Sequence, residues 1–468
     1  NNQFRSSQPR QAPERCAIFL PKDRIKKQEN MIKKILLTIL IGITFLNSYS
    51  QKLNLTKLDS LFKALEEKNL FMGSIAISKN GNIIYNKSIG KADIENNTDF
   101  SFKTKFRIAS VTKIFTSVMM LKAIENKKTT LNQTIDKFFP TIQNSEKITI
   151  GNLLNHRSGI PDFLIAEDFN NGYTKYRSQD EMMSIIGKLK SEFNPDSKAS
   201  YSSSNYYLLT LILEKINKKS YPELLNRQIV KPLKLKSTYF GGKINAENNE
   251  CYSYFFSNKW EKEAEGDTSV PLGAGGIVSN PYDLTVFIEK LFKGKIISTE
   301  SLKTMTHIHD KFGMGIFELP FYEKKGFVHR GRMDSFTSVL SYFPDENLAI
   351  AIISNGAIYS NKKILNAILG NYFNKPYKTT FEPFKPNLED LEKNVGEYSN
   401  SKNQKKIKIS KEYTQLFAQI DNQTLFPIEP IEKDKFGNFW EGNNIEFKSN
   451  GKELLFEENG IKVTLYKN

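Results

Sequence analysis

Apolar and polar positions alternate near both ends of the central part of the chain. In GSIAISKNGNIIYNKSIG, residues 73–90, Ile75 and Ile77 alternate with small polar residues, and Asn80-Gly81 is typical of a two-residue hairpin turn. The same period returns in SFTSVLSYF and LAIAIISN, which flank a turn at residues 344–347. These patterns predict two antiparallel strand pairs that lie far apart in the sequence.

Helical periodicity fills most of the sequence between and around these strands. Residues 57–68 place four leucine and phenylalanine residues on one helical face, and residues 362–373 form a similar apolar helix. SNPYDLTVFIEKLFKG has Asn280 as a cap, Pro281 in the first turn and Gly294 as a stop. Together with the strands, this pattern predicts an α+β fold, with one antiparallel sheet built from both chain ends and a helical subdomain between residues 106 and 300.

The composition changes after residue 375. Three prolines within residues 376–387 predict a linker, and residues 388–468 show short alternating runs, including ELLFEENGIKVTLYKN with a turn at Asn459-Gly460. We therefore expect a main domain over residues 51–375 and a small all-β C-terminal domain over residues 388–468.

The N-terminal sequence predicts export. Residues 1–30 are polar and basic without apolar periodicity, and they are interpreted as an upstream extension. From Met31, two lysines, an apolar run and small polar residues up to Ser50 are typical of a signal peptide, so Gln51 becomes the mature N-terminus. The alternative is an uncleaved anchor. After cleavage we expect a periplasmic or secreted protein with no stable membrane span and no intrachain disulfide, because only Cys251 remains.

Charge and composition exclude one class of function. The chain has 468 residues, is 39% hydrophobic and carries a formal net charge of +16. Its lysines are scattered rather than gathered on one helix face, which indicates a solvated basic surface and no nucleic-acid partner.

One short motif raises a chemical question. In FRIASVTKIFTSVMMLKAIE, Lys113 follows Ser110 by one turn within an apolar helical run. Ser110 has an ordinary interpretation as a helix cap. Alternatively, burial would favour the neutral amine of Lys113, and a neutral amine beside a hydroxyl is a general base beside a nucleophile. The Ser-x-x-Lys spacing also occurs at five other serines, so the motif alone does not decide.

Two later segments change that balance. Tyr201, Ser202 and Ser203 precede an apolar helix, and His329 lies in a predicted strand before Arg330 and Gly331. Each alone has a structural explanation, as a packing tyrosine with a capped helix or as a strand histidine beside a glycine bulge.

In chain order, however, Ser110-Val-Thr-Lys113, Tyr201-Ser-Ser203 and His329-Arg-Gly331 resemble the three motifs of the serine β-lactamase and penicillin-binding-protein superfamily. The sequence looks most like the class C β-lactamase, D,D-peptidase and esterase branch. The resemblance covers residues 57–375 and includes the connecting segments LLNHRSGIPDF, IVKPLKLKSTYF, GAGGIVSNPYDL and FGMGIF.

The resemblance implies a role for each motif residue. Ser110 would be the acylated nucleophile, Lys113 would take its proton, and Tyr201 would pass the proton to the leaving group. His329 would hold the tyrosine and lysine in reactive protonation states through its charge. The backbone N–H groups of Ser110 and Arg332 would form the oxyanion hole, with Gly331 letting the substrate approach.

The departures from the family pattern concern substrate binding. Ser203 stands where the family usually has asparagine, which touches the amide side chain of the substrate. Arg330 replaces a hydroxyl residue that helps to bind a carboxylate, and Arg332 replaces the second glycine of a pair. Arg330 would serve as a cation only if it points inward.

The sequence thus predicts an exported serine hydrolase that acts on a small-molecule or peptide substrate through an acyl-enzyme, as a D,D-carboxypeptidase-like enzyme or an esterase. A β-lactamase is the first alternative. A catalytically silent protein that binds peptidoglycan or peptides is the alternative from another class. We expect no cofactor and no metal, because His307 and His309 have no third ligand nearby.

Overall fold

In the computed structural model, residues 53–468 form one compact unit. The structure describes Met31 and residues 53–165, 173–377, 388–400, 405–412, 415–421, 426–438, 443–458 and 461–468. The predicted signal segment therefore lies outside the described residues, apart from Met31. The predicted linker does so too, apart from residues 376 and 377.

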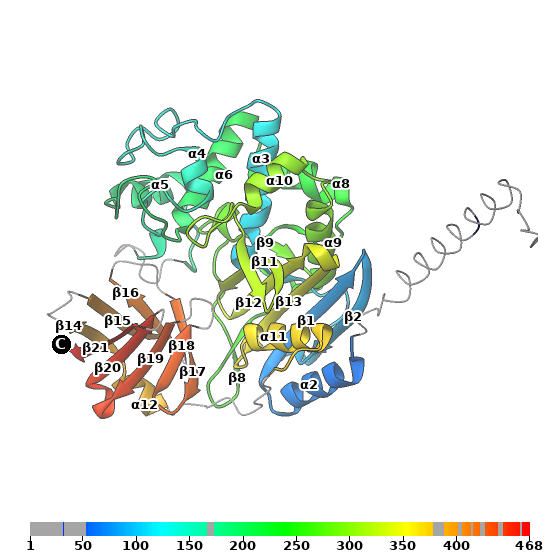
Figure 1. Cartoon of the computed structure of the whole chain (residues 1–468), viewed down its shortest axis with the longest axis vertical. Helices are drawn as coiled ribbons and strands as arrows, with labels where there is room; N and C mark the ends of the chain where they lie inside the picture. The colour runs from blue at the N-terminus through cyan, green and yellow to red at the C-terminus, as the bar shows by residue number, and fades with distance from the viewer. Residues whose placement is uncertain are drawn as a thin grey trace, which may run out of the picture. The chain divides into compact units, whose positions relative to one another are not determined.

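A six-stranded antiparallel sheet forms the centre of the main domain, in the order β10-β11-β12-β13-β1-β2. Figure 1 shows β1 and β2, in blue, beside β12 and β13, in yellow-green, so the two predicted hairpins join into one sheet. The register pairs Ile75 with Ile352, across 277 residues of sequence. The sheet built from both chain ends is thereby confirmed. Its strands are β1 (Phe71–Lys79), β2 (Asn82–Ile89), β10 (Phe317–Phe321), β11 (Lys324–Met333), β12 (Phe336–Phe343) and β13 (Leu348–Ala357).

Helices cover both faces of this sheet, because its central strand is apolar on both sides. Along β13, Ile350 and Ile352 pack into one apolar core, whereas Ala349, Ala351 and Ile353 pack into another. The first core includes the buried residues of α2 (Leu55–Glu67) and α11 (Asn361–Phe373), which confirms both predicted amphipathic helices.

The second core belongs to the predicted helical region. Its helices are α3 (Thr112–Glu125), α4 (Ile150–Leu154), α5 (Gln179–Lys188), α6 (Ser203–Asn217), α7 (Tyr221–Leu225), α8 (Lys231–Leu233), α9 (Pro281–Phe292) and α10 (Thr299–Thr306). Asn280 caps α9 by accepting the N–H of Asp283, as its sequence predicts. Short 3-10 helices include η1 (Ala109–Val111), η2 (Phe163–Ile165) and η6 (Leu272–Ala274).

Small sheets connect the helical region to the central one. A three-stranded sheet in the order β5-β9-β6 joins β5 (Phe106–Arg107), β9 (Ile277–Ser279) and β6 (Tyr239–Phe240). The remaining pairs join β3 (Lys91–Asp93) to β4 (Thr98–Asp99), and β7 (Tyr254–Phe256) to β8 (Trp260–Lys262). Strand β5 leads directly into η1, and so the three-stranded sheet fixes where α3 begins.

The C-terminal part is a closed antiparallel barrel, which confirms the predicted all-β class of residues 388–468. A short helix that the sequence analysis missed, α12 (Leu388–Lys393), precedes it. Aliphatic and aromatic side chains such as Tyr398, Ile407 and Phe447 form a separate core. The strands are β14 (Gly396–Asn400), β15 (Lys405–Glu412), β16 (Gln415–Ile420), β17 (Phe426–Glu432), β18 (Lys435–Asn438), β19 (Asn443–Lys448), β20 (Glu453–Glu458) and β21 (Ile461–Lys467).

Within the residues that the structure describes, none of the helices has the length and apolarity needed to cross a membrane.

Candidate active site

Ser110 lies at the entry to α3, a largely buried helix. It is the central residue of η1. The next residue, Val111, is the capping residue of α3. Ser110 therefore does not occupy the capping position of α3, which removes the main structural explanation for this serine. The preceding Ala109 has φ +45°, in the left-handed region that non-glycine residues rarely adopt. Such strain collects at functional sites.

Lys113 points at Ser110 from within the protein interior. Its side chain is fully buried, and Nζ donates to Ser110 Oγ at 3.1 Å and to the Ala274 carbonyl oxygen at 2.9 Å. Ser203 Oγ lies 3.5 Å from the same nitrogen. A buried lysine amine needs hydrogen-bond acceptors from the protein, and one of these three acceptors belongs to the candidate nucleophile. The structure thus brings together the Ser-x-x-Lys motif and the last residue of the second motif.

Tyr201 lies over the same amine. Lys113 Nζ is 5.0 Å from the centre of the Tyr201 ring, and this ring packs at a tilt against that of His156, with 4.6 Å between the ring centres. His156 was not singled out in the sequence, although it belongs to the quoted segment LLNHRSGIPDF. Burial lowers the pKa of His156 well below its ordinary value, and the charge of Lys113 adds to this. His156 Nδ1 accepts the backbone N–H of Ser202 at 3.1 Å, so a neutral histidine holds the second motif in place.

His329 approaches from β11. It is buried, and its ring lies 6.5 Å from that of Tyr201 and 5.0 Å from that of Phe317. Burial, reinforced by the charge of Lys113, lowers the pKa of His329 to about 3. The imidazole is therefore neutral near pH 7, unlike the charged group that the resemblance implies at this position. Nδ1 lies 2.7 Å from the Arg330 carbonyl oxygen, and Nε2 has no hydrogen-bond partner among the described residues.

Gly331 lets β11 lie directly against η1. A Cβ atom at this position would lie 2.7 Å from Ser110 N and 2.7 Å from Ser338 Oγ, and it would overlap the Ile108 carbonyl oxygen. Only glycine fits such an approach. The third motif therefore runs alongside the backbone N–H of the candidate nucleophile.

The two arginines of the third motif lie differently from the catalytic candidates. Arg330 pairs with Val339 of β12, and Val339 belongs to the core beneath α2 and α11, whereas His329 pairs with Leu340 of the helical core. Since side chains alternate along a strand, Arg330 is on the opposite face from His329. Arg332 has an exposed side chain at the end of β11.

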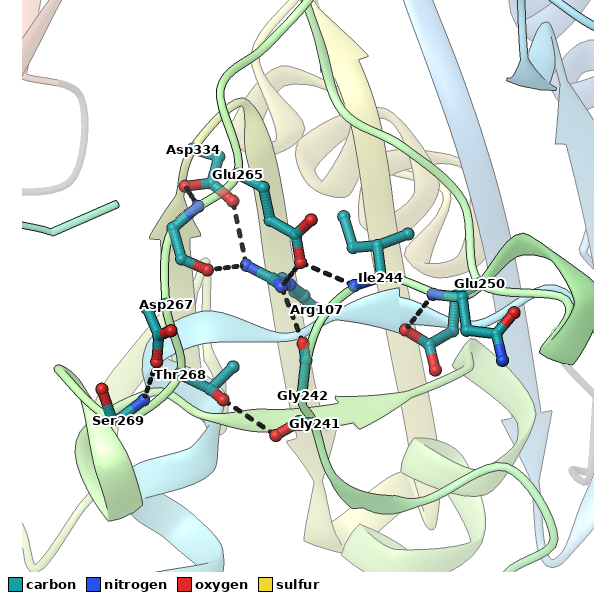
Figure 2. Close-up of polar contacts among 12 residues, drawn as sticks. Arg107, Gly241, Gly242, Ile244, Glu250, Glu265, Asp267, Thr268, Ser269 and Asp334 are labelled. Carbon is teal, nitrogen blue, oxygen red and sulfur yellow. Dashed lines mark hydrogen bonds and ion pairs between the residues drawn. The ribbon is translucent and has the colours of Figure 1, made fainter. Parts of the chain in front are cut away.

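A buried ion-pair network fixes the strand before Ser110 to the turn after Arg332. In Figure 2 the Arg107 guanidinium contacts Glu265 and the Gly242 carbonyl oxygen on one side, and Asp334 and the Gly266 carbonyl oxygen on the other. Arg107 is only 3% exposed, and its Nη1 is 3.3 Å from Asp334. Burial raises the pKa of Asp334 to about 7, although Arg107 opposes this shift. Both sides of the site are thus anchored to one side chain, which no sequence motif marked.

Metal ligands do not gather in the residues that the structure describes, where no three His, Cys, Asp or Glu side chains are placed to bind one ion.

Comparison with known proteins identifies the family of the main domain. The Beta-lactamase family model matches residues 58–368. Protein flp of Staphylococcus aureus (strain MRSA252) is 26% identical over 312 residues, which cover 62% of this chain and 60% of that protein. The match thus spans less than two thirds of that relative's length. Teichoic acid D-alanine hydrolase of the same strain is 25% identical over 329 residues, covering 67% of this chain and 78% of that protein.

Among solved structures, the octameric penicillin-binding protein homologue from Pyrococcus abyssi is similar with a TM-score of 0.62 and 21% identity. The similarity covers 88% of this chain and 100% of that one. The covered share of this chain is larger than the share that residues 53–377 make up. At this identity the match establishes the fold. With a family model that matches most of the chain, and with that family's three motifs gathered around one buried lysine, the chain belongs to the Beta-lactamase family.

Proposed function

We propose that this protein is an exported serine hydrolase that cleaves an ester, amide or peptide bond through an acyl-enzyme on Ser110. The observation that carries the proposal is the hydrogen bond from the fully buried Lys113 amine to Ser110 Oγ. A nucleophile and a base within hydrogen-bond reach, with the base oriented by further groups, are the signature of covalent catalysis. The predicted signal segment supports export.

In the proposed first step, Ser110 Oγ attacks the substrate carbonyl carbon and its proton passes to Lys113 Nζ. The oxyanion that forms is stabilised by the backbone N–H groups of Ser110 and Arg332. The proton then moves through Tyr201 to the leaving oxygen or nitrogen as the scissile bond breaks. The acyl-enzyme remains, and water attacks it in the reverse sense, so that Ser110 recovers its proton and the acid product leaves.

The substrate class that we favour is an acyl group from a D-amino acid. One relative is named a teichoic acid D-alanine hydrolase, and a D-alanyl ester suits a nucleophile of this kind. Arg330 lies on the opposite strand face from His329, so we assign it no role in binding a substrate carboxylate. We propose Ser203, Gly331 and Arg332 as the residues that line the acyl position.

Intact-mass analysis tests the proposal directly. The purified protein is incubated with a penicillin, an activated D-alanyl ester and a D-Ala-D-Ala peptide, with the Ser110→Ala variant as the matched control. We expect a covalent adduct of the ester or peptide acyl group on the wild-type protein only. A stable adduct with penicillin and no turnover would place the protein with the D,D-peptidases, whereas penicillin turnover would favour the β-lactamase alternative. If the protein binds these ligands without an adduct or turnover, the proposal fails in favour of a catalytically silent binding protein.

A further inference from the structure

The second motif departs from its family pattern at Ser203, and this departure creates a hydrogen-bonding problem. For Lys113 to accept the proton of Ser110, the lone pair of its neutral amine must face Ser110 Oγ. A neutral amine has two N–H donors left, and the available acceptors are the Ala274 carbonyl oxygen at 2.9 Å and Ser203 Oγ at 3.5 Å. An asparagine carbonyl oxygen accepts without conditions. A serine hydroxyl accepts in a fixed direction only when its own proton is donated elsewhere.

Asp162 lies where its carboxylate can accept a hydrogen bond from the Ser203 hydroxyl. Its side chain is 2% exposed, and Oδ2 accepts the backbone N–H of Ser203 at 2.9 Å. Oδ1 accepts the backbone N–H of Leu164 at 3.1 Å. Burial raises the pKa of Asp162, and the backbone of Ser203 and Leu164, the charge of Lys113 and the Ser203 hydroxyl oppose this rise. Asp162 is therefore hydrogen-bonded to the backbone of the residue that carries the hydroxyl, and the charge of Lys113 acts on its carboxyl group.

The loop that carries Asp162 also fixes the position of Ser203. Ser204 Oγ donates to the Pro161 carbonyl oxygen at 2.6 Å and accepts the backbone N–H of Phe163 at 2.9 Å. The backbone N–H groups of two successive residues, Ser202 and Ser203, are taken by His156 and Asp162 of one segment. The start of α6 therefore cannot shift to relieve an unmatched hydroxyl.

We infer that Asp162 is a positioning residue that compensates for serine at position 203. Its carboxylate accepts a hydrogen bond from the Ser203 hydroxyl, which makes Ser203 Oγ an acceptor for Lys113 and leaves the lone pair of Lys113 Nζ directed at Ser110. This inference rests on the proposed acyl-enzyme function. It assigns to Asp162 no contact with substrate.

The test is a double-mutant cycle measured as the rate of acylation by an activated ester under single-turnover conditions. Hydrogen bonds to charged groups contribute about 1.5–3 kcal/mol, and so Asp162→Asn is expected to slow acylation about 10- to 100-fold. In a Ser203→Asn background, where the acceptor no longer depends on Asp162, the same change is expected to cost less than about threefold. Glu192→Gln is the matched control, because the charge of Asp162 acts on that carboxyl group, which lies outside the chain of hydrogen bonds. It should leave the rate unchanged.

Several results would overturn the inference. If Asp162→Asn slows acylation equally with serine or asparagine at position 203, Asp162 has a merely structural role. If it leaves the acylation rate unchanged with serine at position 203, Asp162 does not position the base. If Asp162→Asn does not fold, Ser203→Ala and Ser203→Asn decide the matter: the inference requires the alanine variant to be acylated more slowly than the asparagine variant, and the reverse order refutes it. A wild-type protein that is never acylated overturns the proposed function itself, and the inference with it.

Discussion

Gly331 lies against the backbone of Ser110, which makes this residue a sensitive probe of the site. In the Gly331→Ala variant, the new Cβ atom would lie 2.7 Å from Ser110 N, whereas carbon normally stays about 3.3 Å or more from a backbone polar atom. Strand β11 and η1 would therefore separate by about 0.6 Å. The backbone φ of Gly331 is not positive, so the cost comes from space alone.

The size of the effect follows from this displacement. An error of about 1 Å in a reacting geometry can cost about 100-fold in rate, and an oxyanion-hole donor contributes about 100- to 1,000-fold. We expect Gly331→Ala to slow acylation about 10- to 100-fold. Overpacking should lower the free energy of unfolding by about 1–3 kcal/mol. Single-turnover acylation followed by mass spectrometry measures the first effect, and denaturant unfolding measures the second.

Gly326→Ala provides the control on the same strand. A Cβ atom there would meet the ring of Phe343 at 2.8 Å, on the opposite strand face from Gly331. We expect this variant to lose stability without losing acylation rate. If a folded Gly331→Ala protein acylates within about threefold of wild type, the third motif does not shape the oxyanion site.

Three further predictions concern other parts of the chain. Lys113→Arg should abolish acylation as completely as Ser110→Ala does, by about 1,000-fold or more, because arginine keeps its proton in a protein; near-normal labelling by the arginine variant would make Lys113 structural. Because burial raises the pKa of Asp334 to about 7 from 3.8, its contribution to stability is present below about pH 4 and is lost as the pH rises to about 7. Asp334→Asn should therefore reduce the loss in the free energy of unfolding between pH 5 and pH 8, by at most about 3 kcal/mol, and an unchanged pH dependence in denaturant unfolding would contradict this. Finally, protein exported from its host should begin at or near Gln51 when its N-terminus is sequenced, and residues 1–30 on the mature chain would refute both the start and the cleavage site.

The features that the sequence predicted correctly are those that depend on short-range patterns of residues. The hairpin at Asn80-Gly81, the cap at Asn280 and the amphipathic helices α2 and α11 all appear as expected, because strand and helix periods are local properties of the sequence. The pairing of β1 with β13 was also predictable, because two apolar strands at opposite ends of a domain need partners. The three motifs identified the family from the sequence, since a motif is recognised by its residue types and their order, which do not require knowledge of the fold.

The tertiary structure alone decided how the motif residues act on one another. Lys113 and its neighbours are contacted by groups from distant loops: the carbonyl oxygen of Ala274, the ring of His156 and the carboxylate of Asp162. A contact made by a backbone carbonyl cannot be predicted from residue type, because every residue has one. Protonation also depends on three-dimensional burial: His329 was expected to be charged, yet surrounding side chains exclude water and keep it neutral. The sequence by itself determined which chemical groups the site contains. Folding determined their distances, their hydrogen-bond directions and their charges, because these depend on contacts between residues far apart in the chain.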